Sequence, residues 1–173
     1  MSLSKLLLDW RWPVMALLAS FAMLGGAHAF EQFGKLLPCE LCLRQRDVYW
    51  AAIAMILTGL TLSQLRPGRR FLTALNVLIG MVFVTSAVVA FYHAGVELKW
   101  WQGPTGCSGG APIDPLSIDL SKLDKPMATG SCAEVPWSFL GISMAGWNGL
   151  ISVGLATASF IAARVTQVHG RSL

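Results

Sequence analysis

The chain has 173 residues, of which 54% are hydrophobic and only 13% are charged. Soluble domains carry about 25% charged residues, so the composition indicates that lipid surrounds much of this chain. The net charge of +4 is small, and the basic residues are scattered rather than gathered into a nucleic-acid-binding run. We therefore expect a single membrane domain over residues 1–173 that contacts lipid and does not bind nucleic acid.

Four apolar segments each approach the roughly 20 residues that a helix needs to cross the hydrocarbon core of a bilayer. In chain order they are residues 12–30, 48–65, 71–92 and 143–163. None has the alternating pattern of a membrane barrel, and a helix satisfies its own backbone hydrogen bonds in lipid. The sequence predicts an all-α membrane protein, a four-helix transmembrane bundle. Its outer loops are predicted at 31–47 and 93–142, and the second is long and irregular.

The first apolar segment also has features of a secretory signal. Lys5 and Arg11 precede it, and the small residues Ala27 and Ala29 could form a cleavage site. Its uncharged run is longer than the signal core of about 7–15 residues. We therefore expect an uncleaved helix.

The orientation follows from the shortest connection, residues 66–70, which contains three arginines. Short loops rich in Lys and Arg remain in the cytoplasm. Both termini are therefore predicted to be cytoplasmic, and the loops 31–47 and 93–142 face outward. Apolar residues between 113 and 123 could rest on the membrane surface or pack within the loop itself.

All four cysteines lie in the predicted outer loops: Cys39, Cys42, Cys107 and Cys132. Three pairings are possible, and the sequence does not choose between them. If the outer side is the periplasm, disulfides persist there, so two structural bonds are one interpretation. However, a bond within Cys39-x-x-Cys42 closes a very small ring and constrains the unfolded chain little. Such pairs more often serve redox exchange or metal binding.

Metal binding is the weaker of these two interpretations. A structural zinc site usually has two closely spaced ligand pairs, whereas Cys107 and Cys132 are far apart and no histidine lies nearby at ligand spacing. Leu43 follows Cys42, so the haem-attachment pattern is also absent. We therefore predict thiol–disulfide exchange and no metal.

Arg46 follows Cys42 by four residues, one turn along the same face if a helix begins near Cys42. A guanidinium at that place favours the thiolate form of Cys42, and so does the positive end of the helix dipole. Alternatively, Arg46 is an interfacial residue that extends toward water and pairs with Asp47.

The chain resembles the disulfide bond formation protein B (DsbB) family, the quinone-linked thiol oxidases of the bacterial inner membrane. The resemblance covers nearly the whole chain. Its specific parts are Pro38-Cys39-Glu40-Leu41-Cys42 with Arg46, then Cys107, then Cys132-Ala133-Glu134 and Trp137-Ser138-Phe139-Leu140-Gly141.

The resemblance implies a role for each cysteine. Cys39 and Cys42 would be the quinone-coupled pair, with Cys42 nearest the quinone ring. Cys107 and Cys132 would be the shuttle pair. Cys107 would form a mixed disulfide with the partner, a soluble periplasmic thioredoxin-like (DsbA-like) oxidase. The family's location would be the bacterial inner membrane, with the cysteines on the periplasmic side.

The resemblance also implies a cofactor, ubiquinone or menaquinone. Arg46 matches the family's quinone-site arginine. His93, at the outer end of the third segment, falls where a quinone-site histidine lies, although a histidine there is also an ordinary interfacial residue. The cofactor-binding residues are therefore predicted to be Cys42, Arg46 and His93.

Two other classes share some of these features. A tetraspanin-like scaffold has four spans and structural disulfides, but its adjacent Cys-Cys-Gly is missing here. A vitamin K epoxide reductase-type enzyme shares the quinone and thiol chemistry. It should carry its active Cys-x-x-Cys near the last span, whereas residues 143–163 contain no cysteine.

Overall fold

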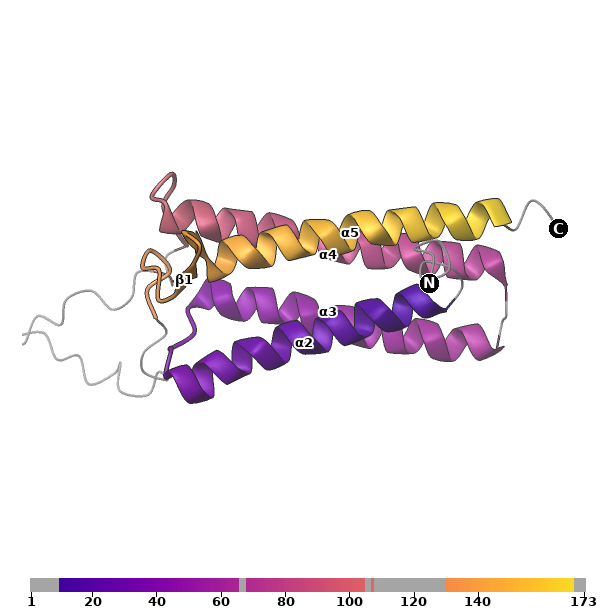
Figure 1. The fold of residues 1–173 in the computed structure, drawn as a ribbon, viewed down its shortest axis with the longest axis horizontal. Helices are drawn as coiled ribbons and strands as arrows, with labels where there is room; N and C mark the ends of the chain where they lie inside the picture. The colour runs from indigo at the N-terminus through magenta and orange to yellow at the C-terminus, as the bar shows by residue number, and fades with distance from the viewer. Residues whose placement is uncertain (1–9, 66–67, 105–106, 108–129, 170–173) are drawn as a thin grey trace, which may run out of the picture.

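The computed structural model describes residues 10–65, 68–104, 107 and 130–169. Its long helices are α2 (Arg11–Gly34), α3 (Glu40–Leu65), α4 (Arg69–Glu97) and α5 (Met144–His169). All four are long and apolar enough to cross a membrane, which confirms the predicted four-helix transmembrane bundle (Figure 1). The segment 113–123 and the first two residues of the basic connection 66–70 lie outside the described residues.

The helices extend beyond the apolar segments from which they were predicted. Because α2 continues to Gly34 and α3 begins at Glu40, most of the predicted loop 31–47 is helical and the true connection is short. Lys35 ends α2 in the left-handed conformation, with φ 54°. The acidic side chain of Glu40 in the first turn of α3 suits the positive helix end. Cys42 and Arg46 therefore lie on the first turns of a helix.

The helices form an elongated bundle in which α4 and α5 pack together over most of their length (Figure 1). The start of α2, the end of α3, the start of α4 and the end of α5 lie at one end of the bundle. The α2–α3 connection and the segment before α5 lie at the other end. Both cysteine-bearing connections therefore share one end, as the predicted topology requires.

Apolar side chains fill the bundle along its length. The buried cluster includes Trp12, Leu24, Ile56, Ile79 and Phe83. The indole N–H of Trp12 donates to Ser159 Oγ at 3.0 Å, so its polar atom is satisfied. At Gly80 a Cβ atom would lie only 2.8 Å from the ring of Phe160. The glycine therefore permits the close approach of α4 and α5.

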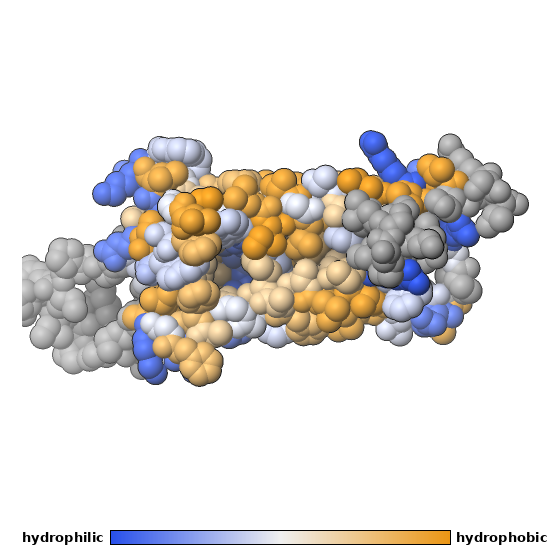
Figure 2. Space-filling view, in the orientation of Figure 1, coloured by the Kyte–Doolittle hydropathy of each residue, from blue (hydrophilic) through white to orange (hydrophobic). Residues whose placement is uncertain are grey.

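The outer surface is apolar over the middle of the bundle and hydrophilic near both ends (Figure 2). Large side chains face outward there, including Leu18, Leu78 and Val88, each more than half exposed. Such a surface would be an aggregation hazard in water, but it is the surface that a lipid bilayer covers. The protein is thus a multi-pass membrane protein.

A small hairpin precedes α5. Strands β1 (Ser138–Phe139) and β2 (Ile142–Ser143) pair antiparallel. Leu140 and Gly141 both have positive φ, 53° and 76°, as a two-residue turn that follows the strand twist requires. The indole N–H of Trp147 donates to the Phe139 carbonyl at 3.1 Å. This bond fixes the hairpin against α5.

Candidate functional site

Cys39 and Cys42 occupy the start of α3 as free thiols. The Cys39 carbonyl accepts a bond from the Leu43 N–H at 3.1 Å, and the Cys42 N–H donates to the Cys39 sulfur at 3.2 Å. A hydrogen bond with the Cys42 side chain, followed by burial, raises the pKa of the Cys39 thiol. Cys39 is therefore the thiol of the pair that retains its proton.

Cys107 and Cys132 form a disulfide, and both are buried. The Cys132 N–H also donates to the Cys107 carbonyl at 3.1 Å. The three pairings that the sequence left open are thus reduced to one, which is the shuttle pair implied by the resemblance.

The two cysteine pairs pack together, although long stretches of sequence separate them. Gly130 forms a parallel bridge with Cys39, and its N–H donates to the Pro38 carbonyl at 3.2 Å. One buried cluster contains Cys39, Leu41, Val96, Cys107 and Cys132, with Cys42 packed against it. The fold therefore collects the four predicted cysteines at one end of the bundle.

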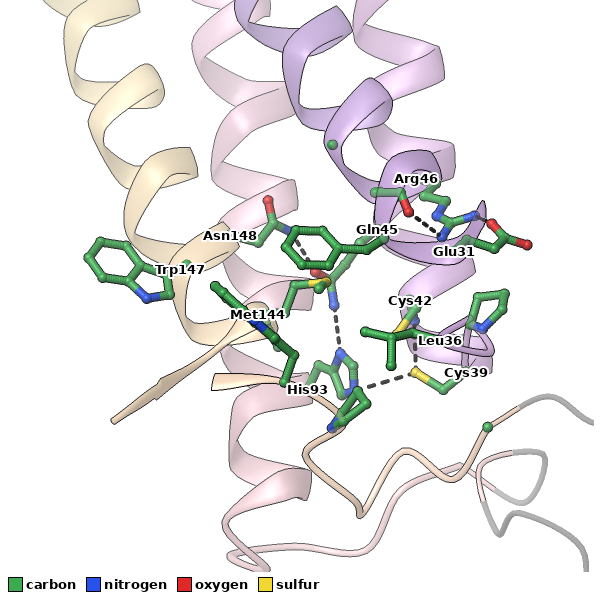
Figure 3. A pocket seen from close by; sticks show the side chains of 18 of the residues that line it. Glu31, Leu36, Cys39, Cys42, Gln45, Arg46, His93, Met144, Trp147 and Asn148 are labelled. Carbon is green, nitrogen blue, oxygen red and sulfur yellow. Dashed lines mark hydrogen bonds and ion pairs between the residues drawn. The ribbon is translucent and has the colours of Figure 1, made fainter. Parts of the chain in front are cut away.

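His93 of α4 lies at the centre of the site (Figure 3). Its Nε2 is 3.5 Å from the Cys39 sulfur, and its Nδ1 is 2.8 Å from Nε2 of Gln45. Glu97, one turn further along α4, has Oε1 3.9 Å from His93 Nε2. His93 is 3% exposed, so it is a built-in part of the site rather than an interfacial side chain.

A chain of buried hydrogen bonds extends from His93 into the bundle. Gln45 accepts from the Asn148 amide at 2.5 Å, and Asn148 accepts from the Tyr49 hydroxyl at 2.6 Å. Tyr49 also contacts Ser152 Oγ at 3.1 Å, which in turn donates to Ser86 at 2.9 Å. This network joins α3, α4 and α5 around His93.

Three residues of the site were not predicted from the sequence: Gln45, Asn148 and Glu97. Asn148 had such a signal, because polar residues within membrane helices are expensive and usually functional, whereas Gln45 and Glu97 fell in the predicted outer loops. Asn148 is the only amide side chain in the apolar segment 143–163. Glu97 follows His93 by four residues and so shares its helix face.

Arg46 pairs with Glu31 of α2 at 2.5 Å and also donates to the Ala27 carbonyl at 3.3 Å (Figure 3). Its ion-pair partner is therefore Glu31, and not Asp47, which the sequence had offered as an alternative partner. Glu31 had been assigned to an outer loop, but it lies in the last turns of α2. This pair ties α2 to α3 beside the cysteines.

A cavity of about 720 Å³ lies between the helices at this end of the bundle. Cys42, Arg46 and His93, the three predicted cofactor-binding residues, all line it. Apolar side chains form much of the remaining wall, among them Met23, Leu24, Phe30, Met144 and Ile151. Apolar walls with a few convergent polar groups are typical of a site for a small organic ligand, and the volume is in the usual range.

Three possible metal ligands lie close together in the site, although the sequence predicts no metal. The ligand atoms of Cys39, Cys42 and His93 all lie within 4.8 Å of one another. His93 is distant from both cysteines in the sequence and comes from a different helix, α4, so spacing along the chain does not reveal this cluster.

A thiol pair and a disulfide in one buried cluster, at the end of a membrane bundle, define a membrane protein of thiol–disulfide exchange. Residues 10–162 match the family described as "Disulfide bond formation protein DsbB". The chain therefore belongs to the DsbB family, whose members are disulfide-generating oxidoreductases.

Individual relatives agree with the family match. "Disulfide bond formation protein B" of Xanthomonas euvesicatoria is 29% identical, over 92% of this chain and 98% of the relative. The protein of the same description from Methylococcus capsulatus is 31% identical, over 81% of this chain and 85% of the relative. No solved structure matches the chain. The resemblance seen in the sequence is confirmed, and it outweighs the tetraspanin-like and vitamin K epoxide reductase-type alternatives.

Proposed function

We propose that the protein is a thiol:quinone oxidoreductase that reoxidises a soluble periplasmic thioredoxin-like oxidase and passes the electrons to a membrane quinone. The observation that carries this proposal is the packing of a disulfide, Cys107–Cys132, and a free thiol pair, Cys39 and Cys42, in one cluster beside a cavity. Electrons that enter at one pair then have a short route to the other.

Electrons would pass through the two cysteine pairs in two exchange steps. A partner dithiol reduces Cys107–Cys132 through a mixed disulfide at Cys107, and the partner becomes a disulfide. The two released thiols then reduce a Cys39–Cys42 disulfide, which regenerates Cys107–Cys132. The arrangement observed, with Cys107 bonded to Cys132 and with Cys39 and Cys42 free, corresponds to the state after this second step.

The cavity beside Cys42 fits a quinone. Apolar walls suit the ring and tail, and the Arg46 guanidinium, the Gln45 amide and the His93 ring supply donors for ring carbonyl oxygens. A quinone held there would accept the two electrons and two protons that leave Cys39 and Cys42 as they form a disulfide. Ubiquinone and menaquinone both have the required carbonyls and apolar tail.

The trapping experiment for this proposal uses Cys132→Ser. The variant leaves Cys107 as a free thiol. When the partner is supplied in its disulfide form, the Cys107 thiolate attacks that disulfide and one partner cysteine leaves as a thiol, so a mixed disulfide through Cys107 should accumulate and be visible on a non-reducing gel. Cys107→Ser is the matched control and should trap nothing. A complex that forms through Cys39 or Cys42 instead would reverse the assignment of the two pairs.

The proposal places the protein in the bacterial inner membrane with both termini in the cytoplasm. The start of α2 and the end of α5 lie at the same end of the bundle as Arg69 and Arg70, where α4 begins. Basic short connections remain cytoplasmic. A reporter enzyme that is active only outside the cytoplasm should be silent when fused to either terminus. Activity at either terminus would invert the orientation and move all four cysteines to the reducing side.

A further inference from the structure

The thiol pair has two buried neighbours that simple disulfide exchange does not require. His93 Nε2 faces the Cys39 sulfur at 3.5 Å, and Glu97 lies behind it with a side chain only 4% exposed. One carboxylate oxygen of Glu97, Oε2, is buried without a hydrogen-bond partner within the described part of the chain. A buried carboxylate oxygen without a partner is costly, so its presence points to a ligand.

The separations match those of ligands around one metal ion. Zinc bonds of about 2.3 Å to sulfur and about 2.1 Å to nitrogen, at a tetrahedral angle, put the two ligand atoms about 3.6 Å apart. The observed separation of the Cys39 sulfur and His93 Nε2 is 3.5 Å. The Cys42 sulfur lies within 4.8 Å of both. Three ligand atoms therefore already surround one point.

Glu97 can complete the set. Its Oε1 is 3.9 Å from His93 Nε2, whereas nitrogen and oxygen ligands of one tetrahedral zinc ion are about 3.4 Å apart. Glu97 is not among the residues whose ligand atoms all lie within 4.8 Å of one another, so its side chain must also turn toward the cysteine sulfurs to become the fourth ligand. Two thiolates, one imidazole and one carboxylate are all ordinary zinc ligands, and the thiolates disfavour Mg²⁺ and Ca²⁺.

The network behind His93 is compatible with metal binding at Nε2. A ligating histidine usually donates its other N–H to a fixed acceptor, and Gln45 lies 2.8 Å from Nδ1. If the amides of Gln45 and Asn148 turn over, Gln45 accepts from Nδ1 and donates to Asn148 Oδ1. Tyr49 then accepts from Asn148 and donates to Ser152. Each polar group in this series of hydrogen bonds therefore keeps a partner whichever way the amides are turned.

We propose that the reduced Cys39–Cys42 pair, together with His93 and Glu97, forms a binding site for a thiophilic divalent cation, Zn²⁺. Binding displaces the thiol protons and involves no electron transfer. A disulfide between Cys39 and Cys42 removes two of the four ligands, so the site exists only in the reduced protein. A bound ion in turn holds both sulfurs and prevents their oxidation. Zn²⁺ would therefore inhibit electron transfer through this pair.

The experiment uses the full chain with Cys107→Ser and Cys132→Ser, purified into lipid nanodiscs without quinone. Cys39 and Cys42 are then the only thiols, and no result depends on exchange with a partner. Co²⁺ is the probe, because tetrahedral thiolate coordination gives it characteristic visible and near-ultraviolet absorption. Reduced protein should bind one Co²⁺, Zn²⁺ should displace it, and protein with an oxidised Cys39–Cys42 pair should bind none.

Two variants separate a four-ligand site from simple chelation by two thiols. Glu97→Gln and His93→Ala should each weaken Zn²⁺ binding by at least about tenfold, since loss of even an outer-shell partner costs about 10–100-fold. Glu40→Gln, next to Cys39 but paired with Arg44, is the matched control and should leave the affinity unchanged. Thermal unfolding of each variant without metal shows whether it remains folded.

Equal binding by reduced and oxidised protein would overturn the proposal. So would an affinity that neither folded variant changes, because the thiols alone would then account for it. Quinone reduction by metal-free protein with all four cysteines is measured separately. Its failure would contradict the proposed oxidoreductase function while leaving the metal site intact.

Discussion

The two cysteine pairs are held in different ways. Cys39 directly precedes α3 and Cys42 lies in its first turn, and their surroundings include His93 and the wall of the cavity. Cys107 and Cys132 lie outside the long helices, joined by their disulfide and a backbone hydrogen bond. Gly130, close to Cys132, docks this pair through its contacts with Pro38 and Cys39.

This difference separates the two tasks that the proposed function requires. A small ligand needs fixed groups around it, because positioning and electrostatics are what a protein contributes to cofactor chemistry. A protein partner needs a disulfide that its own thiolate can attack. The pair at the start of α3 is suited to the first task. The second task falls to the pair outside the helices, which is buried here and must be uncovered before a partner thiolate reaches it. Substitutions that remove one pair at a time should therefore have different effects.

The largest effect is expected from Cys39→Ala. Without a Cys39–Cys42 pair, electrons that reach Cys107 and Cys132 have no onward acceptor. Steady-state oxidation of a reduced thioredoxin-like partner should fall to the uncatalysed background. At most one equivalent of partner should be oxidised per protein, by the existing Cys107–Cys132 disulfide. The time course of partner thiols, measured by alkylation with excess quinone present, gives both quantities.

Cys107→Ala is the counterpart and should abolish even the single equivalent. If Cys39→Ala continues to turn over beyond one equivalent, the two pairs do not act in series, and the comparison between them fails.

Much of this architecture was accessible from the sequence. The four helices follow from runs of apolar residues, and the importance of Cys39 and Cys42 follows from their spacing. The family motifs led to Arg46 and His93, and both line the same cavity. Helix ends were harder to predict. The N-terminal part of α3 extends beyond the hydrocarbon core and contains charged residues, which a hydropathy pattern assigns to a loop.

The contacts across the bundle could not be predicted. Nothing local to Arg46 indicates that it pairs with Glu31, because that contact depends on how α2 crosses α3. The link from His93 through Gln45 to Asn148 likewise joins three helices. Lipid-facing and core-facing residues are both apolar in a membrane helix, so the sequence shows little of which face packs inward.

A second, smaller effect is expected at Arg46. Arg46→Met keeps the bulk of the side chain but removes its donors and charge. Hydrogen bonds that involve a charged group contribute about 1.5–3 kcal/mol, so the KM for quinone should rise by about tenfold or more. Arg46→Lys keeps the charge but loses the planar fork, and should lie between Met and the wild type. The measurement is initial rate against quinone concentration in nanodiscs.

Arg44→Met is the matched control, because Arg44 is exposed and pairs with Glu40 on the same helix. An exposed pair contributes little, so this variant should retain the quinone KM. Glu31→Gln tests whether the ion pair or the guanidinium itself matters, and should have a smaller effect than Arg46→Met. An unchanged KM in a folded Arg46→Met protein would reduce Arg46 to a link between α2 and α3.

The smallest effect concerns the contact that joins the two pairs. A Cβ atom at Gly130 would lie 2.7 Å from the Leu37 carbonyl oxygen, which is too close for carbon and oxygen. Gly130→Ala should therefore push this segment away and weaken the bond from the Gly130 N–H to the Pro38 carbonyl. Loss of one such bond is worth about 1 kcal/mol, or about fivefold in an equilibrium between docked and undocked forms.

Only the step between the pairs should respond. After mixing with a reduced partner, the appearance of thiols at Cys39 and Cys42 should slow by up to about fivefold, while the reaction of the partner with Cys107 keeps its rate. Rapid acid quench, alkylation and mass spectrometry resolve the two events. Gly154→Ala on α5 is the control, since a Cβ there meets nothing within 4 Å. If Gly130→Ala slows the partner reaction instead, the docking of Gly130 on Cys39 shapes the partner's site, and the division of tasks between the pairs is less sharp than their surroundings indicate.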